Sequence, residues 1–115
     1  MLKYLISLTL ISNLFIPTAE ASQQKASWYG REYHGRRMAN GQIYNMYSNT
    51  CAHKTLPFGT KLRVTNLRNG KFTTCLVFDR GPFVKGRVVD MSYQGARNLG
   101  MVKSGVVPVR IQVIK

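Results

Sequence analysis

The chain has 115 residues, and its 17 lysines and arginines against four aspartates and glutamates give a formal net charge of +13. Its length allows one small domain with one core and excludes two. Such an excess of positive charge attracts polyanions, which for an exported protein are anionic cell-wall glycan, lipid headgroups or surface polymers. A solvated basic surface without a specific partner is the alternative interpretation of the same charge.

Residues 1–21 predict a secretory signal peptide. Lys3 precedes the apolar stretch YLISLTLISNLFI, and the small residues Ala19 and Ala21 offer a cleavage site. A membrane anchor is the alternative, but the apolar run is shorter than the roughly 20 residues of a spanning helix. We therefore expect export, cleavage after Ala21, and a domain of residues 22–115 in the periplasm or at the cell wall, with no stable membrane span. This compartment argues against nucleic acid as a partner.

Residues 26–60 are rich in aromatic residues, Gly and Asn and show little regular periodicity. This composition predicts loops and short strands that display side chains. The aromatic residues fit two interpretations, a packed core or platforms on which sugar rings stack. The sequence leaves both open for Trp28, Tyr29, Tyr33, Tyr44 and Tyr47.

Cys51 and Cys75 are the two cysteines of the chain. In an oxidising compartment we expect them to form one disulfide, which stabilises a loop of this length by roughly 3 to 4 kcal/mol. Two buried thiols, or a nucleophile formed by Cys51 with the nearby His53, are the alternatives. We favour the disulfide because Cys75 lies in an apolar strand pattern.

The segment TKLRVTNLRNGKFTTCLVFD predicts a β-hairpin. Leu62 and Val64 alternate with polar residues, Asn69 and Gly70 predict a tight turn, and the second strand covers residues 72–78. The hairpin is the clearest local structure of the chain.

The C-terminal third predicts two further strands around a short helix. GRVVD, residues 86–90, is a strand candidate, and SYQGARNLG predicts a helix with Ser92 as N-cap and Gly100 at its end. The run GVVPVRIQVI alternates apolar residues, and Pro108 places its start at an edge or a strand entry. We therefore expect a mainly β domain with one or two short helices.

The motifs of the mature chain resemble those of the rare lipoprotein A (RlpA-like) family in order and spacing. They are ASWYG, HGRRMANGQIYN, CAHKTLPFGTKLRVTNLRNGK, FDRGPFVKGRVVDMS and ARNLGM. The resemblance implies a six-stranded double-psi β-barrel, similar in shape to expansins and family 45 endoglucanases. It also implies a lytic transglycosylase that cleaves the β-1,4 MurNAc-GlcNAc bond of peptidoglycan, preferring glycan strands without stem peptides. We expect the barrel alone, without the C-terminal peptidoglycan-binding domain of some members or a lipid-attachment cysteine.

The resemblance also assigns site residues. It places Asp79 of DRGPF at a position that the family needs for activity, with His53 in the same groove. The other essential family carboxylate is a Glu, and here Gln42 takes its place; a further motif position is Asn45, and Met38 replaces the usual Thr. Because an amide cannot transfer a proton, Gln42 supports binding at most.

A transglycosylase needs fewer proton-transfer groups than a hydrolase, because the C6 hydroxyl of MurNAc attacks within the same sugar. One carboxyl can protonate the leaving oxygen and later take the C6 proton. We expect Asp79, shielded by Phe78, Pro82 and Phe83, to have this role, with Arg80 beside it. Asp90 is either a second groove carboxyl or a helix cap.

Two functions therefore stay open, a transglycosylase and an expansin-like barrel that binds glycan without cleaving it. His53 either contacts Asp79 or a sugar hydroxyl, or is a structural residue. The expected substrate-binding residues are Trp28, Tyr29, Arg80, Gln42 and Asn45.

The spacing of the two His and two Cys repeats no known metal pattern, so we expect no metal and no cofactor. The expected partners are peptidoglycan strands and the cell-division machinery, and we expect a monomer.

Overall fold

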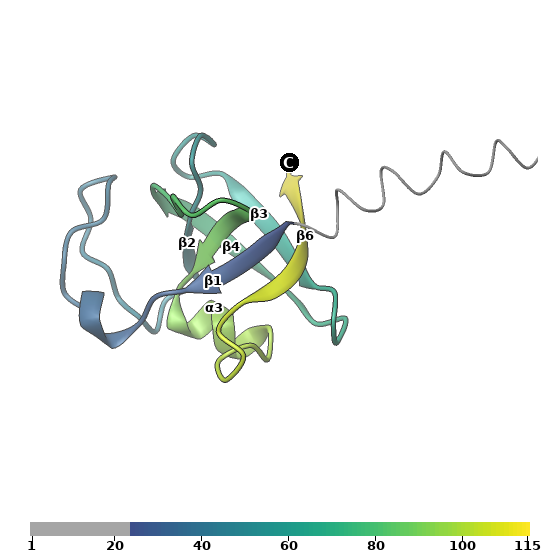
Figure 1. The fold of residues 1–115 in the computed structure, drawn as a ribbon. Helices are drawn as coiled ribbons and strands as arrows, with labels where there is room; N and C mark the ends of the chain where they lie inside the picture. Colours follow the sequence, from purple (N-terminus) through teal and green to yellow (C-terminus); the bar gives the residue numbers. More distant parts are fainter. Residues whose placement is uncertain (1–23) are drawn as a thin grey trace, which may run out of the picture.

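The computed structural model describes residues 24–115, so the predicted signal peptide lies outside the described residues. Six strands close into one barrel (Figure 1): β1 (Lys25–Trp28), β2 (Thr50–Ala52), β3 (Lys61–Asn66), β4 (Phe72–Asp79), β5 (Arg87–Met91) and β6 (Val107–Ile114). Their order around the barrel is β1-β5-β2-β4-β3-β6. The pairs β1/β5 and β2/β4 are parallel, and the other neighbours are antiparallel. The mainly β, six-stranded prediction is confirmed.

The predicted hairpin is present as β3 and β4. Leu62 pairs with Cys75 and Val64 with Thr73 in an antiparallel register. Leu62 and Val64 are fully buried, as their alternation with polar residues predicts. The turn uses Gly70 at a φ of 77°, a left-handed conformation that glycine adopts without strain.

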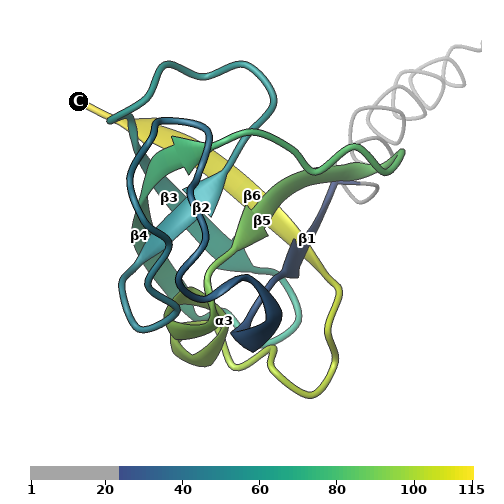
Figure 2. The ribbon, with the colours of Figure 1, turned by 90° about the vertical axis from the view of Figure 1, so that its left-hand side faces the viewer.

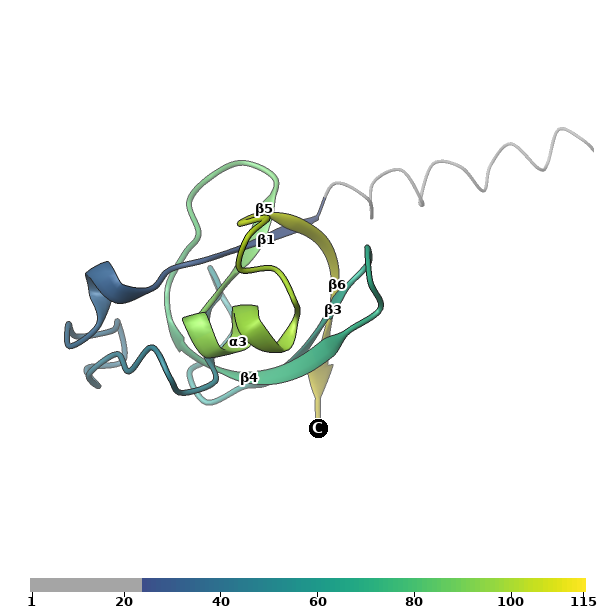
Figure 3. The ribbon, with the colours of Figure 1, turned by 90° about the horizontal axis from the view of Figure 1, so that it is seen from below.

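Helix α3 (Tyr93–Asn98) lies across one end of the barrel, as Figure 3 shows from below. Ser92 is its N-cap, and the Ser92 hydroxyl accepts a hydrogen bond from Gly95 N at 3.1 Å. Gly100, at a φ of 66°, follows the last turn. Ala96 and Leu99 of this segment are buried in the main core with the inward side chains of the strands. Burial of these apolar groups closes this end of the barrel.

The segment between β1 and β2 extends to one side of the barrel in Figure 1 and lies in front of the barrel in Figure 2. It contains the 3-10 helix η1 (Arg31–Tyr33). A second, smaller core attaches it to the barrel and consists of Tyr29, Met38, Tyr44, Met46 and Ala52. The Tyr44 hydroxyl donates to Tyr29 O at 2.6 Å, which satisfies this buried polar group. The aromatic residues of this region are thus divided, because Tyr29 and Tyr44 are core whereas Tyr33 and Tyr47 are exposed.

Strand β6 follows the predicted alternation only in its first half. Val107 and Val109 are 1 % exposed, but Val113 is 48 % exposed. Near Val113 strand β6 pairs only with β3, because the pairing of β1 with β6 is limited to Val107 and Pro108. Pro108 is the second residue of the strand, which agrees with a strand entry.

A disulfide joins Cys51 of β2 to Cys75 of β4, and the two Cα atoms are 5.8 Å apart. The two residues are 24 positions apart in sequence. Both are buried in the main core. The cross-link therefore ties the N-terminal half of the barrel to the hairpin.

Replacing both cysteines by alanine, Cys51→Ala with Cys75→Ala, should lower the free energy of unfolding by roughly 3 kcal/mol, because the unfolded chain regains the entropy of a loop of this length. Urea denaturation followed by circular dichroism measures the loss. The oxidised wild type with and without a reducing agent is the matched control. An unchanged urea midpoint in the double variant would show that the disulfide does not stabilise the barrel.

Candidate active site

Four residues on four adjacent strands form a single row across the barrel wall. Ser27 of β1 pairs with Asp90 of β5, Asp90 pairs with Ala52 of β2, and Ala52 pairs with Asp79 of β4. Adjacent strands are about 4.8 Å apart, so the backbones of the two aspartates are separated by roughly 10 Å along the wall. Because the residue between them is an alanine, a space is left between the two carboxyls.

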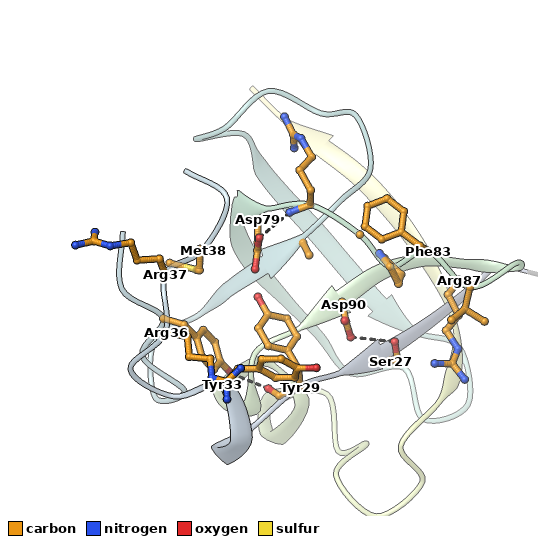
Figure 4. A pocket seen from close by; sticks show the side chains of 16 residues that line it. Ser27, Tyr29, Tyr33, Arg36, Arg37, Met38, Asp79, Phe83, Arg87 and Asp90 are labelled. Atoms are coloured by element: carbon orange, nitrogen blue, oxygen red, sulfur yellow. Dashed lines mark hydrogen bonds between the residues drawn. The ribbon is translucent and has the colours of Figure 1, made fainter. Parts of the chain in front are cut away.

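This row forms the floor of an open cavity of about 500 Å³. Figure 4 shows Asp79 and Asp90 in its middle, with Arg36, Arg37 and Met38 on one side and Phe83 and Arg87 on the other. The remaining lining residues are Ser27, Tyr29, Tyr33, Tyr44, Ala52, Arg80, Gly81, Pro82 and Val84. A cavity of this size fits part of a sugar chain.

Asp79 ends strand β4, and its Oδ1 atom accepts hydrogen bonds from the backbone N–H groups of Ala39 and Arg80, both at 2.9 Å. These two amides orient the carboxyl toward the cavity. The expectation that Phe83 shields Asp79 is wrong, because Phe83 is 80 % exposed and stands at the rim.

Asp90 lies in the middle of the row and accepts a hydrogen bond from the Ser27 hydroxyl at 2.9 Å. Burial raises the pKa of Asp90, and the negative charge of Asp79 adds to this rise, while Ser27 and Arg87 oppose it. The cap of α3 is provided by Ser92, so of the two alternatives for Asp90 the structure shows the groove position. Asp90 therefore holds a proton to a higher pH than an exposed aspartate.

Tyr29 directly follows β1 and lies below the two aspartates in the view of Figure 4. Its hydroxyl is buried near the Asp79 carboxyl, but forms no hydrogen bond of good geometry within residues 24–115. Burial and the nearby Asp79 charge raise the pKa of this phenol, so the group is neutral. A neutral hydroxyl in this position is a hydrogen-bond donor available to the site.

Arg80 lines the cavity, but its guanidinium is held by the neighbouring loop. Its Nη1 donates to Leu56 O at 2.9 Å and to His53 O at 3.2 Å. The guanidinium also lies 4.0 Å from the centre of the Phe58 ring. Arg80 thus fixes the loop beside Asp79.

His53 is not among the residues that line this cavity. Its Nδ1 accepts the backbone N–H groups of Thr55 and Leu56, each at 3.1 Å. Burial lowers the pKa of His53, as do the charges of Arg80 and Lys54, so the imidazole is neutral near pH 7. In this structure the ring stabilises a turn, and a direct role in proton transfer stays a prediction.

Three further predicted residues also lie outside the cavity lining: Gln42, Asn45 and Trp28. Gln42 and Asn45 are exposed. The Asn45 side chain accepts a hydrogen bond from Tyr47 N. Trp28 packs on the main core and against Tyr93, with ring centres 5.7 Å apart. A role of these residues in substrate binding stays a prediction.

The predicted site residues did not include the lining residues Ser27, Ala52, Arg36 and Arg37. Ser27 stands in a short strand, and its hydrogen bond to Asp90 spans 63 positions. Arg36 and Arg37 are adjacent in the motif HGRRMANG, and this pair of basic residues is the one sequence feature that could have indicated their place in the site. The row itself depends on the pairing of distant strands.

Within residues 24–115, no cluster of three or more His, Cys, Asp or Glu side chains is suited to hold a metal ion. In the same part of the chain, no helix has the length and apolar character needed to cross a membrane.

The strand order, the two parallel pairs and the carboxyl-lined cavity define a protein of the double-psi β-barrel class. Two solved structures are similar to this chain in fold. A Streptomyces papain inhibitor aligns with a TM-score of 0.64 and 21 % identity over 79 % of this chain and 91 % of its own. An expansin of Clavibacter michiganensis aligns with a TM-score of 0.63 and 20 % identity over 80 % of this chain and 49 % of its own.

The sequence profile of the family described as "Lytic transglycolase" matches residues 21–111, so the chain belongs to this family. A relative from Vibrio cholerae, named endolytic peptidoglycan transglycosylase RlpA, is 51 % identical over 98 residues. This match covers 85 % of the present chain but only 37 % of the Vibrio protein. The RlpA-like resemblance is confirmed, and the chain spans well under half the length of this relative.

Proposed function

We propose that this chain cleaves the β-1,4 MurNAc-GlcNAc bond of peptidoglycan strands lacking stem peptides and leaves 1,6-anhydromuramyl ends. The observation that carries the proposal is the pair Asp79 and Asp90, which stand in one row on either side of the small Ala52. A sugar over Ala52 has one carboxyl on each side, the arrangement that glycoside hydrolases use to cleave the glycosidic bond. The name of the Vibrio cholerae relative supports the same activity.

The two aspartates divide the proton transfers. Asp90, which keeps its proton to a higher pH, donates it to the O4 atom of the departing GlcNAc as the C1–O4 bond breaks. Asp79 takes the proton of the C6 hydroxyl, whose oxygen forms the new bond to C1. No water is consumed, and the two carboxyls regain their starting states by exchanging protons with solvent. Each group acts within the cavity that both side chains line.

Exposed aromatic side chains at the cavity rim support the binding of a sugar chain. Phe83 is 80 % exposed and Tyr33 is 46 % exposed, and both line the cavity. Aromatic faces pack against the apolar faces of sugar rings, and burying them there is favourable. We expect these two rings to hold the sugars that flank the cleaved bond.

A barrel that binds glycan without cleaving it is the second candidate function. It is favoured by one observation, the amide Gln42 at the position where the family resemblance implies a catalytic Glu. Against this candidate, residue 42 is exposed and outside the cavity lining, while two carboxyls stand inside. Incubation of stem-peptide-free strands with the protein, followed by sedimentation and mass spectrometry, separates the two. Anhydromuramyl fragments support the enzyme, and bound but intact strands support the binder.

Restoring a carboxyl by Gln42→Glu should leave turnover within about threefold of the wild type, because residue 42 is exposed and is not among the residues that line the cavity with the two aspartates. Proton-transfer groups act only at hydrogen-bond distance from the substrate. Gln42→Ala is the matched control for loss of the amide. The rate of anhydromuramyl release measures both. A gain of tenfold or more in Gln42→Glu would mean that the native protein is impaired and would favour the binder.

Such an activity places the protein in the periplasm or at the cell wall, as expected for an exported chain. We further propose that it acts as a monomer, and that the cell-division machinery is its partner where new wall is made. Its high positive charge supports attachment to anionic wall polymers.

A further inference from the structure

One wall of the cavity carries two exposed arginines, Arg36 and Arg37 (Figure 4). All four basic side chains that line the cavity are arginines, and the other two are Arg80 and Arg87. A guanidinium binds a carboxylate through two parallel hydrogen bonds, which a lysine ammonium cannot do. The choice of arginine therefore indicates an anionic group of the ligand.

The four arginines differ in how far they are already engaged. Arg80 donates to two loop carbonyls, and Arg87 is half-buried and opposes the pKa rise of Asp90. Arg37 uses one nitrogen, Nη1, to hold Gly41 O at 2.8 Å. Arg36 lies 5.8 Å from the centre of the Tyr33 ring. Arg36 and Arg37 are exposed, and these contacts occupy few of their N–H donors. Both residues line the cavity proposed to hold the substrate.

The proposed substrate carries one kind of negative charge. In a strand without stem peptides, the lactyl ether of every MurNAc ends in a free carboxylate, whereas the remaining groups of the sugars are neutral. In a strand with stem peptides the same carboxyl is an amide and has no charge. A guanidinium in the wall of the site therefore favours the peptide-free form.

We infer that Arg36 and Arg37 bind the lactyl carboxylate of MurNAc and thereby select strands without stem peptides. The inference rests on the proposed function and adds to it the group that is recognised. It also assigns a specific role to part of the high positive charge of the chain. Charge-assisted hydrogen bonds of this type change affinity by about tenfold to a hundredfold.

The test compares two proteins with two substrates. The double variant Arg36→Gln with Arg37→Gln is set beside Arg110→Gln with Lys103→Gln, a control that removes the same charge from exposed residues outside the cavity lining. The substrates are peptide-free strands and the same strands after their lactyl carboxylates have been converted to methylamides. Both strand binding, by sedimentation, and the kcat/KM for anhydromuramyl release are measured.

The wild type and the control should lose about tenfold or more when the carboxylates are masked. The cavity double variant should lose as much on free strands and nothing further on masked strands. Each loss is compared with the wild type on the same substrate. The inference is overturned if the cavity variant loses equally on free and on masked strands, if the control loses as much on free strands as the cavity variant, or if masking does not change the wild type. If the wild type binds free strands in preference to masked ones but releases no fragments, the recognition holds and the proposed cleavage is wrong.

Discussion

The Asp79→Asn variant should release anhydromuramyl fragments at least about 100-fold more slowly than the wild type, because an amide cannot take the proton of the C6 hydroxyl. The substitution is nearly isosteric. The Oδ1 atom of the new side chain still accepts the hydrogen bonds from Ala39 N and Arg80 N. The barrel and its cavity should therefore persist, and mass spectrometry of strand digests measures the loss of chemistry alone.

Strand binding and thermal unfolding are the controls for Asp79→Asn. We expect the variant to sediment with peptide-free strands and to unfold at a temperature close to that of the wild type. A variant that is folded, binds strands and retains wild-type turnover would remove Asp79 from the chemistry.

The Asp90→Asn variant should also lose activity by about 100-fold, but it should unfold at a higher temperature than the wild type at neutral pH. The Asn side chain can still accept the Ser27 hydroxyl. The Asn side chain lacks the proton that protonated Asp90 donates to the leaving oxygen. It also lacks the negative charge of ionised Asp90, whose burial is unfavourable. Activity measurements and calorimetry on the same preparation test the two effects together.

The sign of the stability change follows from the raised pKa of Asp90. Between the ordinary aspartate pKa and the raised value, the folded protein binds more protons at this site than the unfolded chain. The contribution of Asp90 to stability therefore falls as pH increases through this interval. Asp90→Asn removes this contribution, so its advantage should disappear below the ordinary pKa and be full above the raised one. A variant less stable than the wild type at neutral pH would contradict this account of Asp90.

The local elements of the fold could be predicted because their signals lie within a few residues. Asn69 and Gly70 mark the turn of the hairpin, and Ser92 and Gly100 mark the ends of the helix. Their chemistry is set by the backbone conformation at those positions. Val113 is the exception, because its exposure depends on which strand lies beside it and not on its own sequence.

The arrangement of the site could be predicted only in part. The motifs indicated Asp79 and Asp90, but the row that joins them passes through Ala52, a residue without a chemical signal. Parallel pairing of β1 with β5 and of β2 with β4 links segments far apart in the chain, so its register follows from closure of the whole barrel.

Loop residues were the hardest to place from sequence. His53 is held by the amides of Thr55 and Leu56, and Phe83 points to the rim instead of covering Asp79. Both outcomes depend on the path of an irregular segment, which periodicity does not describe.

Digestion of peptide-free glycan strands in ¹⁸O-labelled water tests the central claim most directly. If the C6 hydroxyl attacks C1 between Asp79 and Asp90, mass spectrometry should show 1,6-anhydromuramyl ends that contain no ¹⁸O. Reducing MurNAc ends labelled with ¹⁸O would show hydrolysis by water, and intact strands would show no cleavage. Either of these results would contradict the account.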